Sequence, residues 1–381
     1  MAMPIIMLEE EDPIYGDMLE ETLSRVPLID LIPTLRVSKS WNQAVHSSLL
    51  SRNPPKPWLI IHSQATRHPY AATTRAYDPR SRVWIKMSQP ASIIRHATAL
   101  RSSNSNFLYM LSPSKLSFSF DKLNLRWHHV DAPLLWRGDP IVTKVGDSIV
   151  VAGGTCDFED DPLAVEIYSI KNRSWRTCDS MPARLKDSAA STWLSVAATP
   201  EKLFVMEKHS GATYWFDLDS NDWSKQFDLR PDQRCFYSVI GCVKERLILV
   251  GLIGDVENVE KVKVWEVGYD SNSGSFDRCM EIGEMPRLFV EKLESETFGI
   301  SSINICLAGS FVYIYNPEKV EEVVACELIK GGGCNWGSVH NAVSGGGCGM
   351  ERVVFTCADV KVEQLERALR AENRRFEVVN V

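Results

Sequence analysis

Two hydrophobic patterns divide the chain. Between residues 13 and 50, apolar side chains recur at helical spacing in three short stretches. Pro27 ends the first stretch, and Pro33 is compatible with the second because it falls in the first turn. Each stretch begins near a residue that can cap a helix, namely Asp17, Asp30 and Ser38. The pattern therefore predicts a module of three short helices.

Beyond Pro57 the apolar residues form short runs separated by turn-forming residues, and one signature recurs. An aromatic residue stands seven positions before a tryptophan, with a polar turn between them. Each copy predicts a β-hairpin, because an apolar strand, a polar turn and a second strand follow in order. A sixth, degenerate copy begins near Tyr313. The clear copies end at Trp84, Trp127, Trp175, Trp223 and, with phenylalanine in the tryptophan position, Phe276.

The spacing of these copies matches a β-propeller. Neighbouring copies lie 43 to 53 residues apart, and another apolar run precedes each hairpin. One more strand per unit gives four strands, which is the size of a propeller blade. Too few residues precede Trp84 for a whole first blade, whereas those after Phe276 exceed one blade. We therefore expect about six blades, with a late strand such as 351–357 completing the first blade and closing the ring.

These patterns divide the chain into four segments. An acidic N-terminal tail covers 1–12, the helical module covers 13–57 and the propeller covers 58–360. Residues 361–381 form a C-terminal helix and tail, with apolar residues on one side and arginines nearby.

Loops that follow the second strand of a blade are the predicted binding site for a partner. They differ in length between blades, at 112–115, 155–162, 207–211 and 254–261, and variable loops on a rigid scaffold usually carry recognition. Their acidic residues favour a partner with a basic surface, and the alternative is a solvated rim. The candidate residues are Asp157, Glu159, Asp160, Asp161, His209, Asp255 and Glu257.

Charge and cysteine spacing exclude several classes of partner. The formal net charge of −7 gives no general attraction for a phosphate backbone, which argues against nucleic acid. The longest apolar run, 247–253, is too short to span a membrane. The ten cysteines contain no C-x-x-C pair and indicate reduced thiols, so the expected location is the cytoplasm, the nucleus or both.

No catalytic motif is found in the sequence. A phosphate-binding loop, a zinc-protease helix and a serine-hydrolase elbow are all missing. The glycine-rich stretch 330–349 lacks the lysine of a phosphate loop and is interpreted as a mobile loop. Cys334, His340 and Cys348 lack a fourth metal ligand. We therefore predict no catalytic residue, no metal and no cofactor.

The helical stretch PIYGDMLEETLSRVPLIDLIPTLRVSKSWNQAV resembles an F-box. The proline, the leucine-rich helix ending in Leu-Ser-Arg-Val-Pro and the Arg-Val-Ser-Lys-Ser-Trp segment carry the resemblance, while Ile14, Tyr15 and Ser38 depart from the usual pattern. The alternative is a helical cap on the next domain. The resemblance implies docking onto a Skp-type adaptor through Pro13, Ile14, Leu19, Leu23, Val26, Pro27 and Leu31.

The third repeat unit resembles a kelch repeat, since it holds the diglycine Gly153-Gly154, then Tyr168 and Trp175. The order of segments resembles the plant F-box/kelch-repeat proteins, which implies a small all-α F-box module followed by an all-β kelch-type β-propeller. The resemblance further implies a non-catalytic substrate-recognition subunit of an SCF-type (Skp–cullin–F-box) E3 ubiquitin ligase. The F-box would bind the adaptor, and through it a cullin-RING ligase. The propeller would bind a target protein for ubiquitination and proteasomal degradation, a target class that in this family includes phenylpropanoid and flavonoid enzymes.

Two alternatives stay open at this point. A kelch scaffold protein would bind partners without ubiquitin transfer. A kelch-propeller copper oxidase would need a cluster of Tyr, His and Cys at the ring axis.

Overall fold

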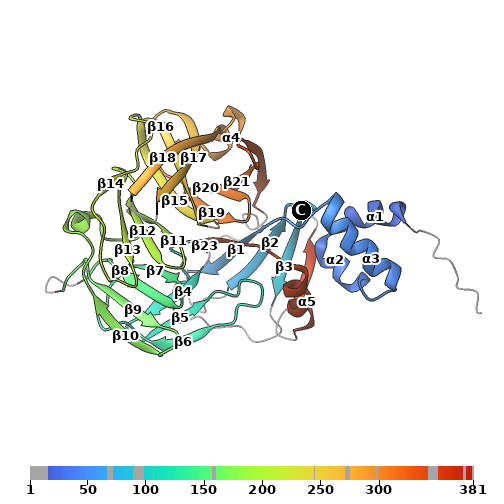
Figure 1. Cartoon of the computed structure of the whole chain (residues 1–381), viewed down its shortest axis with the longest axis horizontal. Coiled ribbons are helices and arrows are strands. Elements are labelled where there is room, and N and C mark those ends of the chain that lie inside the picture. Colours follow the sequence, from blue (N-terminus) through green and yellow to red (C-terminus); the bar gives the residue numbers. More distant parts are fainter. Residues whose placement is uncertain are drawn as a thin grey trace, which may run out of the picture.

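The computed structural model shows a helical module beside a six-bladed propeller (Figure 1). It describes residues 16–66, 72–88, 98–105, 107–156, 160–243, 245–270, 275–296, 299–341, 351–371 and 375–379.

The module contains three α-helices and a short π-helix. Ser38 caps the third helix as predicted, because its Oγ accepts a hydrogen bond from the Trp41 backbone N–H at 3.2 Å. The second helix begins earlier than predicted, so Asp30 lies inside its first turn and Pro33 near its end. The earlier start buries Leu28 and Ile29 with the rest of the apolar face. The elements are α1 (Asp17–Ser24), α2 (Leu28–Thr34), α3 (Lys39–Ser47) and the π-helix η1 (Ser48–Arg52).

The first blade is closed by strands from both ends of the chain. The late strand pairs with β1 from Trp58↔Ala358 to Ala65↔Glu351, so the predicted closure is confirmed. The tail beyond α5 (Val362–Arg370) was predicted as a helix and tail, yet it also adds a fifth strand on the open edge of β3. From the axis outward the strands are β23 (Glu351–Ala358), β1 (Trp58–Ala65), β2 (Ala72–Asp78), β3 (Val83–Ser88) and β24 (Arg375–Val379).

The other five blades follow in chain order around the ring. In the second blade the innermost strand is reduced to a bridge between Arg101 and Tyr109. Blade 2 has β4 (Leu108–Ser112), β5 (Lys115–Ser119) and β6 (His128–Asp131); blade 3 has β7 (Ile141–Val145), β8 (Ser148–Ala152), β9 (Val165–Ser169) and β10 (Ser174–Cys178). Blade 4 has β11 (Leu194–Ala198), β12 (Lys202–Glu207), β13 (Ala212–Asp217) and β14 (Phe227–Asp228).

Short helices precede two of the blades, and the fifth and sixth blades carry the longest strands. A 3-10 helix, η2 (Ala183–Ser188), precedes blade 4, and α4 (Arg287–Leu293) precedes blade 6. Each follows a proline, which ends one of the two repeated Met-Pro linkers. Blade 5 has β15 (Cys235–Val243), β16 (Arg246–Gly254), β17 (Val259–Asp270) and β18 (Ser275–Glu284); blade 6 has β19 (Asn304–Ala308), β20 (Phe311–Asn316), β21 (Lys319–Leu328) and β22 (Cys334–His340).

The repeated aromatic signature marks the hairpin of the third and fourth strands. In four copies the two aromatic residues lie opposite each other, with ring centroids 5.1–5.6 Å apart. The copy from Phe120 to Trp127 differs, because β5 ends at Ser119 and β6 begins only at His128. Both aromatic residues therefore lie in the connection, and Phe120 stacks on His128 instead. The paired residues are Tyr77–Trp84, Tyr168–Trp175, Phe216–Trp223 and Tyr269–Phe276.

The last blade corrects two predictions. The sixth copy near Tyr313 is wrong as a third–fourth hairpin, since Tyr313 lies on β20, the second strand. Part of the glycine-rich stretch expected as a mobile loop is strand β22. Gly331, Gly332 and Gly333 all have positive φ and form the turn before it, which brings the following residues back along β21.

The two faces of the ring carry different connections. We call the face with the connections from second to third strands, and from each blade to the next, the loop face. We call the opposite face the turn face. The predicted loops at 112–115, 155–162, 207–211 and 254–261 do connect second to third strands, so they lie on the loop face. The linker at 54–57 enters β1 from the turn face.

The helical module packs on the turn-face side of the first blade. Its buried leucines and isoleucines form one hydrophobic cluster with Trp58, Ile85 and the α5 residue Leu365. Arg80, in the β2–β3 turn, is 7% exposed and donates hydrogen bonds to carbonyls of the module. The module therefore has a fixed position relative to the propeller, next to α5 and β3 (Figure 1).

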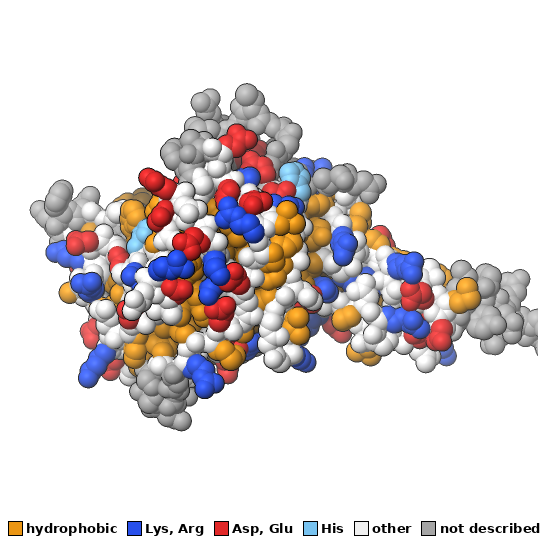
Figure 2. Space-filling model, turned by 90° about the horizontal axis from the view of Figure 1, so that it is seen from above, with side chains coloured by type: hydrophobic (Ala, Val, Ile, Leu, Met, Phe, Trp, Pro, Cys, Tyr) orange, Lys and Arg blue, Asp and Glu red, His pale blue; other side chains and the backbone are white. Residues whose placement is uncertain are grey.

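The edge of the ring seen in Figure 2 is a solvated surface. Basic and acidic side chains are interspersed there. On the outer strands of blade 5, Lys263 pairs with Glu281 at 2.9 Å and Lys261 with Glu284 at 3.0 Å. Exposed pairs of this kind contribute about 0–1 kcal/mol, so they indicate solvation and not a binding site.

The diglycine of the third blade packs closely against neighbouring backbone. Gly153 has φ +67°, and a Cβ there would lie 2.4 Å from the Ala189 carbonyl oxygen. A Gly153→Ala change should lower the free energy of unfolding by about 3 kcal/mol, because strain and overlap add. Gly331→Ala, where φ is +97° and the space is open, should lose only about 1 kcal/mol. Urea unfolding followed by tryptophan fluorescence measures both, and equal losses would contradict the packing argument.

Candidate functional site

The F-box-like module buries part of its predicted adaptor-binding set. Leu19, Leu23 and Leu31 are at most 3% exposed and pack in the cluster shared with blade 1. Val26 and Pro27 are half-buried, and Pro13 and Ile14 lie outside the described residues. In this structure the three leucines therefore hold the module together and leave little side-chain surface for a partner.

Three other apolar side chains of the module face solvent. Met18 on α1 is 72% exposed, Val37 before α3 is 62% exposed and Leu50 on the π-helix is 84% exposed. The π-helix breaks the regular spacing after α3, which is why helical periodicity gave no reason to select Leu50. Exposed apolar side chains of this kind are suited to a partner protein.

A cavity of about 660 Å³ lies at the axis of the propeller. It is lined by the innermost strands β11, β15 and β19, by Ile141 of β7 and by Phe355 of β23. The segment 102–105 closes the cavity near the turn face. The Ser105 hydroxyl accepts a hydrogen bond from the Leu307 backbone N–H at 3.0 Å, and the Ser105 carbonyl accepts one from the Cys357 backbone N–H at 3.3 Å. The cavity therefore opens toward the loop face, away from the helical module.

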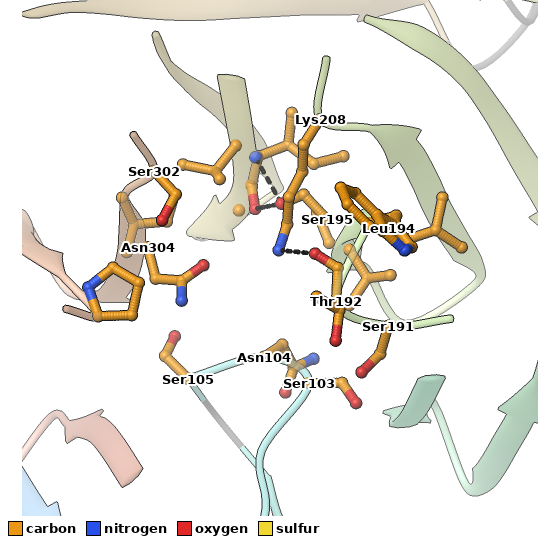
Figure 3. A pocket seen from close by; sticks show the side chains of 18 of the residues that line it. Ser103, Asn104, Ser105, Ser191, Thr192, Leu194, Ser195, Lys208, Ser302 and Asn304 are labelled. Carbon is orange, nitrogen blue, oxygen red and sulfur yellow. Dashed lines mark hydrogen bonds between the residues drawn. The ribbon is translucent and has the colours of Figure 1, made fainter. Parts of the chain in front are cut away.

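Hydroxyl and amide groups dominate the polar lining of this cavity (Figure 3). Ser195 joins blades 4 and 5 by donating to the Ile240 carbonyl at 3.2 Å and accepting from the Ile240 N–H at 2.9 Å. Asn304 lies across the cavity from Lys208 (Figure 3). The other polar residues there include Ser103, Asn104, Ser105, Ser191, Thr192 and Ser302.

Lys208 is a buried cation in this cavity. Its side chain leaves the end of β12 on the loop face and is 8% exposed. The ammonium donates a hydrogen bond to the Thr192 carbonyl oxygen at 2.9 Å. Burial lowers the pKa of Lys208 to about 8, and the charge of Asp139 acts in the opposite direction.

Aromatic and apolar side chains surround the cavity mouth. Trp193 is 49% exposed and Val256 is 50% exposed, and both line the cavity. The His209 ring lies between Trp193 and Tyr237, with centroid distances of 5.9 and 5.1 Å. Tryptophan and tyrosine are enriched among residues that dominate binding energy at protein interfaces.

The loop between β6 and β7 presents two more apolar side chains on the same face. Leu134 is 72% exposed and Trp136 is 47% exposed. The next residue, Arg137, forms a buried ion pair with Glu166 of β9, and Glu166 also accepts from the Leu134 N–H at 2.6 Å and the Leu135 N–H at 3.3 Å. This loop is therefore held rigidly while its apolar side chains face solvent.

The loop residues predicted to bind a target lie mostly outside the cavity. His209 lines it, whereas Asp160, Asp161, Asp255 and Glu257 do not. Asp255 accepts hydrogen bonds from the backbone N–H groups of Glu257 and Asn258, and Asp161 from that of Leu163, so these two carboxylates stabilise their own loops. Asp157 and Glu159 lie outside the described residues. A role for these residues in target binding stays a prediction.

Sequence reasoning missed the cavity although a weak signal existed. Serine- and asparagine-rich segments at 101–105, 188–195 and 301–304 lie at or just before the inner edge of their blades. Small polar residues at the start of an inner strand point toward the ring axis. Lys208 carried no signal, because a lysine after a strand normally lies in solvent.

Side chains of the kinds that ligate metals are scattered over the described part of the chain. Among them no three His, Cys, Asp or Glu side chains approach closely enough to hold a metal ion. Four of the described cysteines, Cys235, Cys306, Cys326 and Cys357, are buried thiols. His340 lies 3.1 Å from the Glu322 carboxylate, and Cys348 of the weighed metal set falls outside the described part. No helix in the described part is long and apolar enough to cross a membrane.

Comparison with known proteins identifies both parts of the chain. The family model for the F-box domain matches residues 17–53. An F-box/kelch-repeat protein of Arabidopsis thaliana is 42% identical over 372 residues, which cover 95% of this chain and 94% of that protein. F-box only protein 6 of Arabidopsis thaliana is 24% identical over 269 residues, covering 66% of this chain and 54% of that protein.

Similarity to a solved structure is weaker. The protein in "Structure of YjhT" aligns with a TM-score of 0.37 and 9% identity over 57% of this chain and 68% of its own. This likeness is too low to carry an argument about function.

Proposed function

Because the chain belongs to the plant F-box/kelch-repeat family, we propose that it is a substrate-recognition subunit of an SCF-type E3 ubiquitin ligase. The F-box binds a Skp-type adaptor, and through it a cullin-RING ligase. The propeller binds a target protein, which is then ubiquitinated and degraded by the proteasome. The subunit raises the local concentration of target lysines at the ligase and catalyses nothing itself.

The position of the F-box on the propeller supports this proposal most directly. The module packs on the turn-face side of blade 1, while the cavity and its apolar rim open on the loop face. Arg80 bonds to three module carbonyls near the end of α1, which fixes the distance and direction between the two surfaces. A receptor needs such a fixed geometry to hold a target at a constant place relative to the ligase.

We assign target binding to the loop face around the cavity mouth. Trp136 and Trp193 are half-exposed tryptophans on separate, anchored loops. Leu134 lies on the same loop as Trp136, and Val256 lines the cavity together with Trp193. Rigid aromatic side chains lose little conformational entropy on binding. A phenylpropanoid or flavonoid enzyme is the class of target that the family suggests.

Adaptor binding is the decisive experiment. A pull-down of the full chain with a purified Skp-type adaptor should succeed. Leu50→Glu combined with Met18→Glu should weaken adaptor binding at least about tenfold, because two exposed apolar side chains are replaced by charged ones. Leu134→Glu on the loop face is the matched control and should leave adaptor binding unchanged.

Two results would count against the ligase role. If the wild-type chain does not bind the adaptor, the alternative of a scaffold without ubiquitin transfer is favoured. If the double variant binds as well as wild type, the exposed side chains are not the adaptor surface. A change at Leu23 is a poor test, because this residue is 2% exposed and its replacement by Asp would unfold the module.

A further inference from the structure

The ammonium of Lys208 has unused hydrogen-bonding capacity inside the axial cavity. A lysine carries three N–H donors, and among the described residues only the Thr192 carbonyl accepts one. No described carboxylate forms an ion pair with it. Figure 3 shows the ammonium pointing into the cavity, toward the side from which Asn304 projects. A buried, incompletely bonded cation is costly unless something else compensates its charge.

The neighbouring carboxylate is already occupied. Asp139 accepts hydrogen bonds from Arg101 at 2.6 Å, from the Ser191 hydroxyl at 2.8 Å and from the Thr192 N–H at 3.0 Å. Burial and the positive charge of Arg101 lower the pKa of Arg352, whereas the negative charge of Asp139 raises it. The Nη1 atom of Arg352 is buried without a hydrogen-bond partner in the described part of the chain. Three cations therefore share one carboxylate near the loop-face end of the axis.

The opposite wall supplies neutral donors. The Asn304 carboxamide lines the cavity and has no hydrogen-bond partner among the described residues, and the Ser302 hydroxyl lies next to it (Figure 3). A carboxamide on the wall opposite an ammonium offers N–H donors of the kind that carboxylate and phosphate oxygens accept from. The Ser302 hydroxyl is already hydrogen-bonded to the Tyr237 phenol. A cavity of about 660 Å³ has the size of a small-molecule site.

We propose that the axial cavity binds a single small oxyanion, a carboxylate or phosphate group, with Lys208 as its charge partner and Asn304 as a neutral donor. The site admits one such group and not a run of them, because Glu318, Asp255 and Glu257 are exposed on the loop face around it. The group belongs either to a free small molecule or to an acidic side chain of a bound protein. This inference does not depend on adaptor binding.

Anion titration of the full chain tests the site. Sodium sulfate, which does not titrate between pH 7 and 9.5, is compared with sodium chloride at equal ionic strength by calorimetry and thermal unfolding. Wild type should bind sulfate saturably. Lys208→Met should weaken binding at least about tenfold, since a close charge partner is lost. Lys171→Met, at an exposed turn on the opposite face, should bind like wild type.

Thermal unfolding without anion shows whether loss of binding in the Lys208 variant comes from unfolding. The lowered pKa means that the folded state holds the charged form less readily than the unfolded state does. Between pH 8 and the ordinary pKa of lysine, the unfolded chain carries the extra proton, so stability rises with pH. Below about pH 8 the buried charge lowers stability. Lys208→Met without anion should therefore unfold at the same or a higher temperature than wild type.

The pH profile separates this site from a structural role. Sulfate affinity should fall by about tenfold per pH unit above pH 8, as Lys208 loses its proton. The other charged or titratable side chains around the cavity are Asp139, Arg101, Arg352, His209, Tyr237, Tyr315, Cys242 and Glu318. Burial raises the pKa of Tyr315 and that of Cys242. Burial raises the pKa of Tyr237, so its phenol stays neutral over this range.

Two further probes identify the source of the anion. Glutarate represents a free small carboxylate, and the capped peptide Ala-Glu-Ala, with Ala-Gln-Ala as its control, represents an acidic side chain of a target. Binding of the peptide that Lys208→Met abolishes assigns the cavity to a protein target. Binding of glutarate or sulfate alone assigns it to a free anion. The proposal is overturned if none of the probes binds saturably, or if Lys208→Met binds them as well as wild type does.

Discussion

Replacing Arg80 with alanine is expected to release the F-box from the propeller while the six blades stay folded. The Arg80 guanidinium donates to the carbonyls of Asn53 at 2.8 Å, Ser24 at 3.1 Å and Leu23 at 3.3 Å, and also to Val26 at 2.5 Å. Hydrogen bonds from a buried charged donor are stronger than neutral ones, and their loss leaves several buried carbonyls without a donor. We expect the docking free energy to fall by about 4 kcal/mol.

Hydrogen exchange of the full chain measures this release. Amides in residues 17–53 should exchange roughly a thousandfold faster in Arg80→Ala than in wild type, because about 1.4 kcal/mol corresponds to a factor of ten. Amides of the inner strands should be unchanged. Arg82→Ala in the same turn is the matched control, since Arg82 is exposed. Equal protection of the module in both variants would show that its apolar contacts alone fix it.

Target ubiquitination should respond to the same change. If the fixed distance between adaptor and target matters, Arg80→Ala should retain adaptor binding and target binding while transfer to the target slows. If transfer is unaffected, a flexible connection suffices, and the rigid docking serves stability only.

The blades could be predicted because their signals are local. Tyr168 and Trp175 lie seven residues apart and become register partners in one hairpin, so a short stretch of sequence contains the whole interaction. Closure by β23 could be predicted by counting residues at the two ends of the chain. The outer strand β24 could not be predicted, because its pairing with β3 depends on where α5 directs the chain. Val379 meets Trp84 only in the folded ring.

The cavity could not be predicted for a similar reason. Asn104, Ser195 and Asn304 come from blades 2, 4 and 6, and only closure of the ring brings them around one axis. The acidic loops attracted attention because charge is visible in a sequence. What the sequence does not show is that Asp255 binds its own loop N–H groups, whereas Lys208 points inward.

Replacing Glu166 with alanine should destabilise the propeller by about 3–5 kcal/mol. Glu166 is fully buried and Arg137 is 2% exposed, so the variant would leave a buried guanidinium without its carboxylate. The change also removes the acceptor for the Leu134 and Leu135 N–H groups. Glu201→Ala, at an exposed glutamate of blade 4, should change stability by less than about 0.5 kcal/mol. Urea unfolding of the full chain measures both.

A double variant separates the ion pair from the loop it anchors. Arg137→Met with Glu166→Leu removes both charges, so its loss should be smaller than the sum of the two single losses by about 2–3 kcal/mol. The loop N–H groups lack an acceptor in this variant too. The loop that carries Leu134 and Trp136 should therefore be more mobile than in wild type, and target capture should be weaker than in wild type even where stability recovers. Full recovery of target capture in the double variant would mean that the anchored loop does not contribute to recognition, and additive losses would mean that the two side chains do not act as a pair.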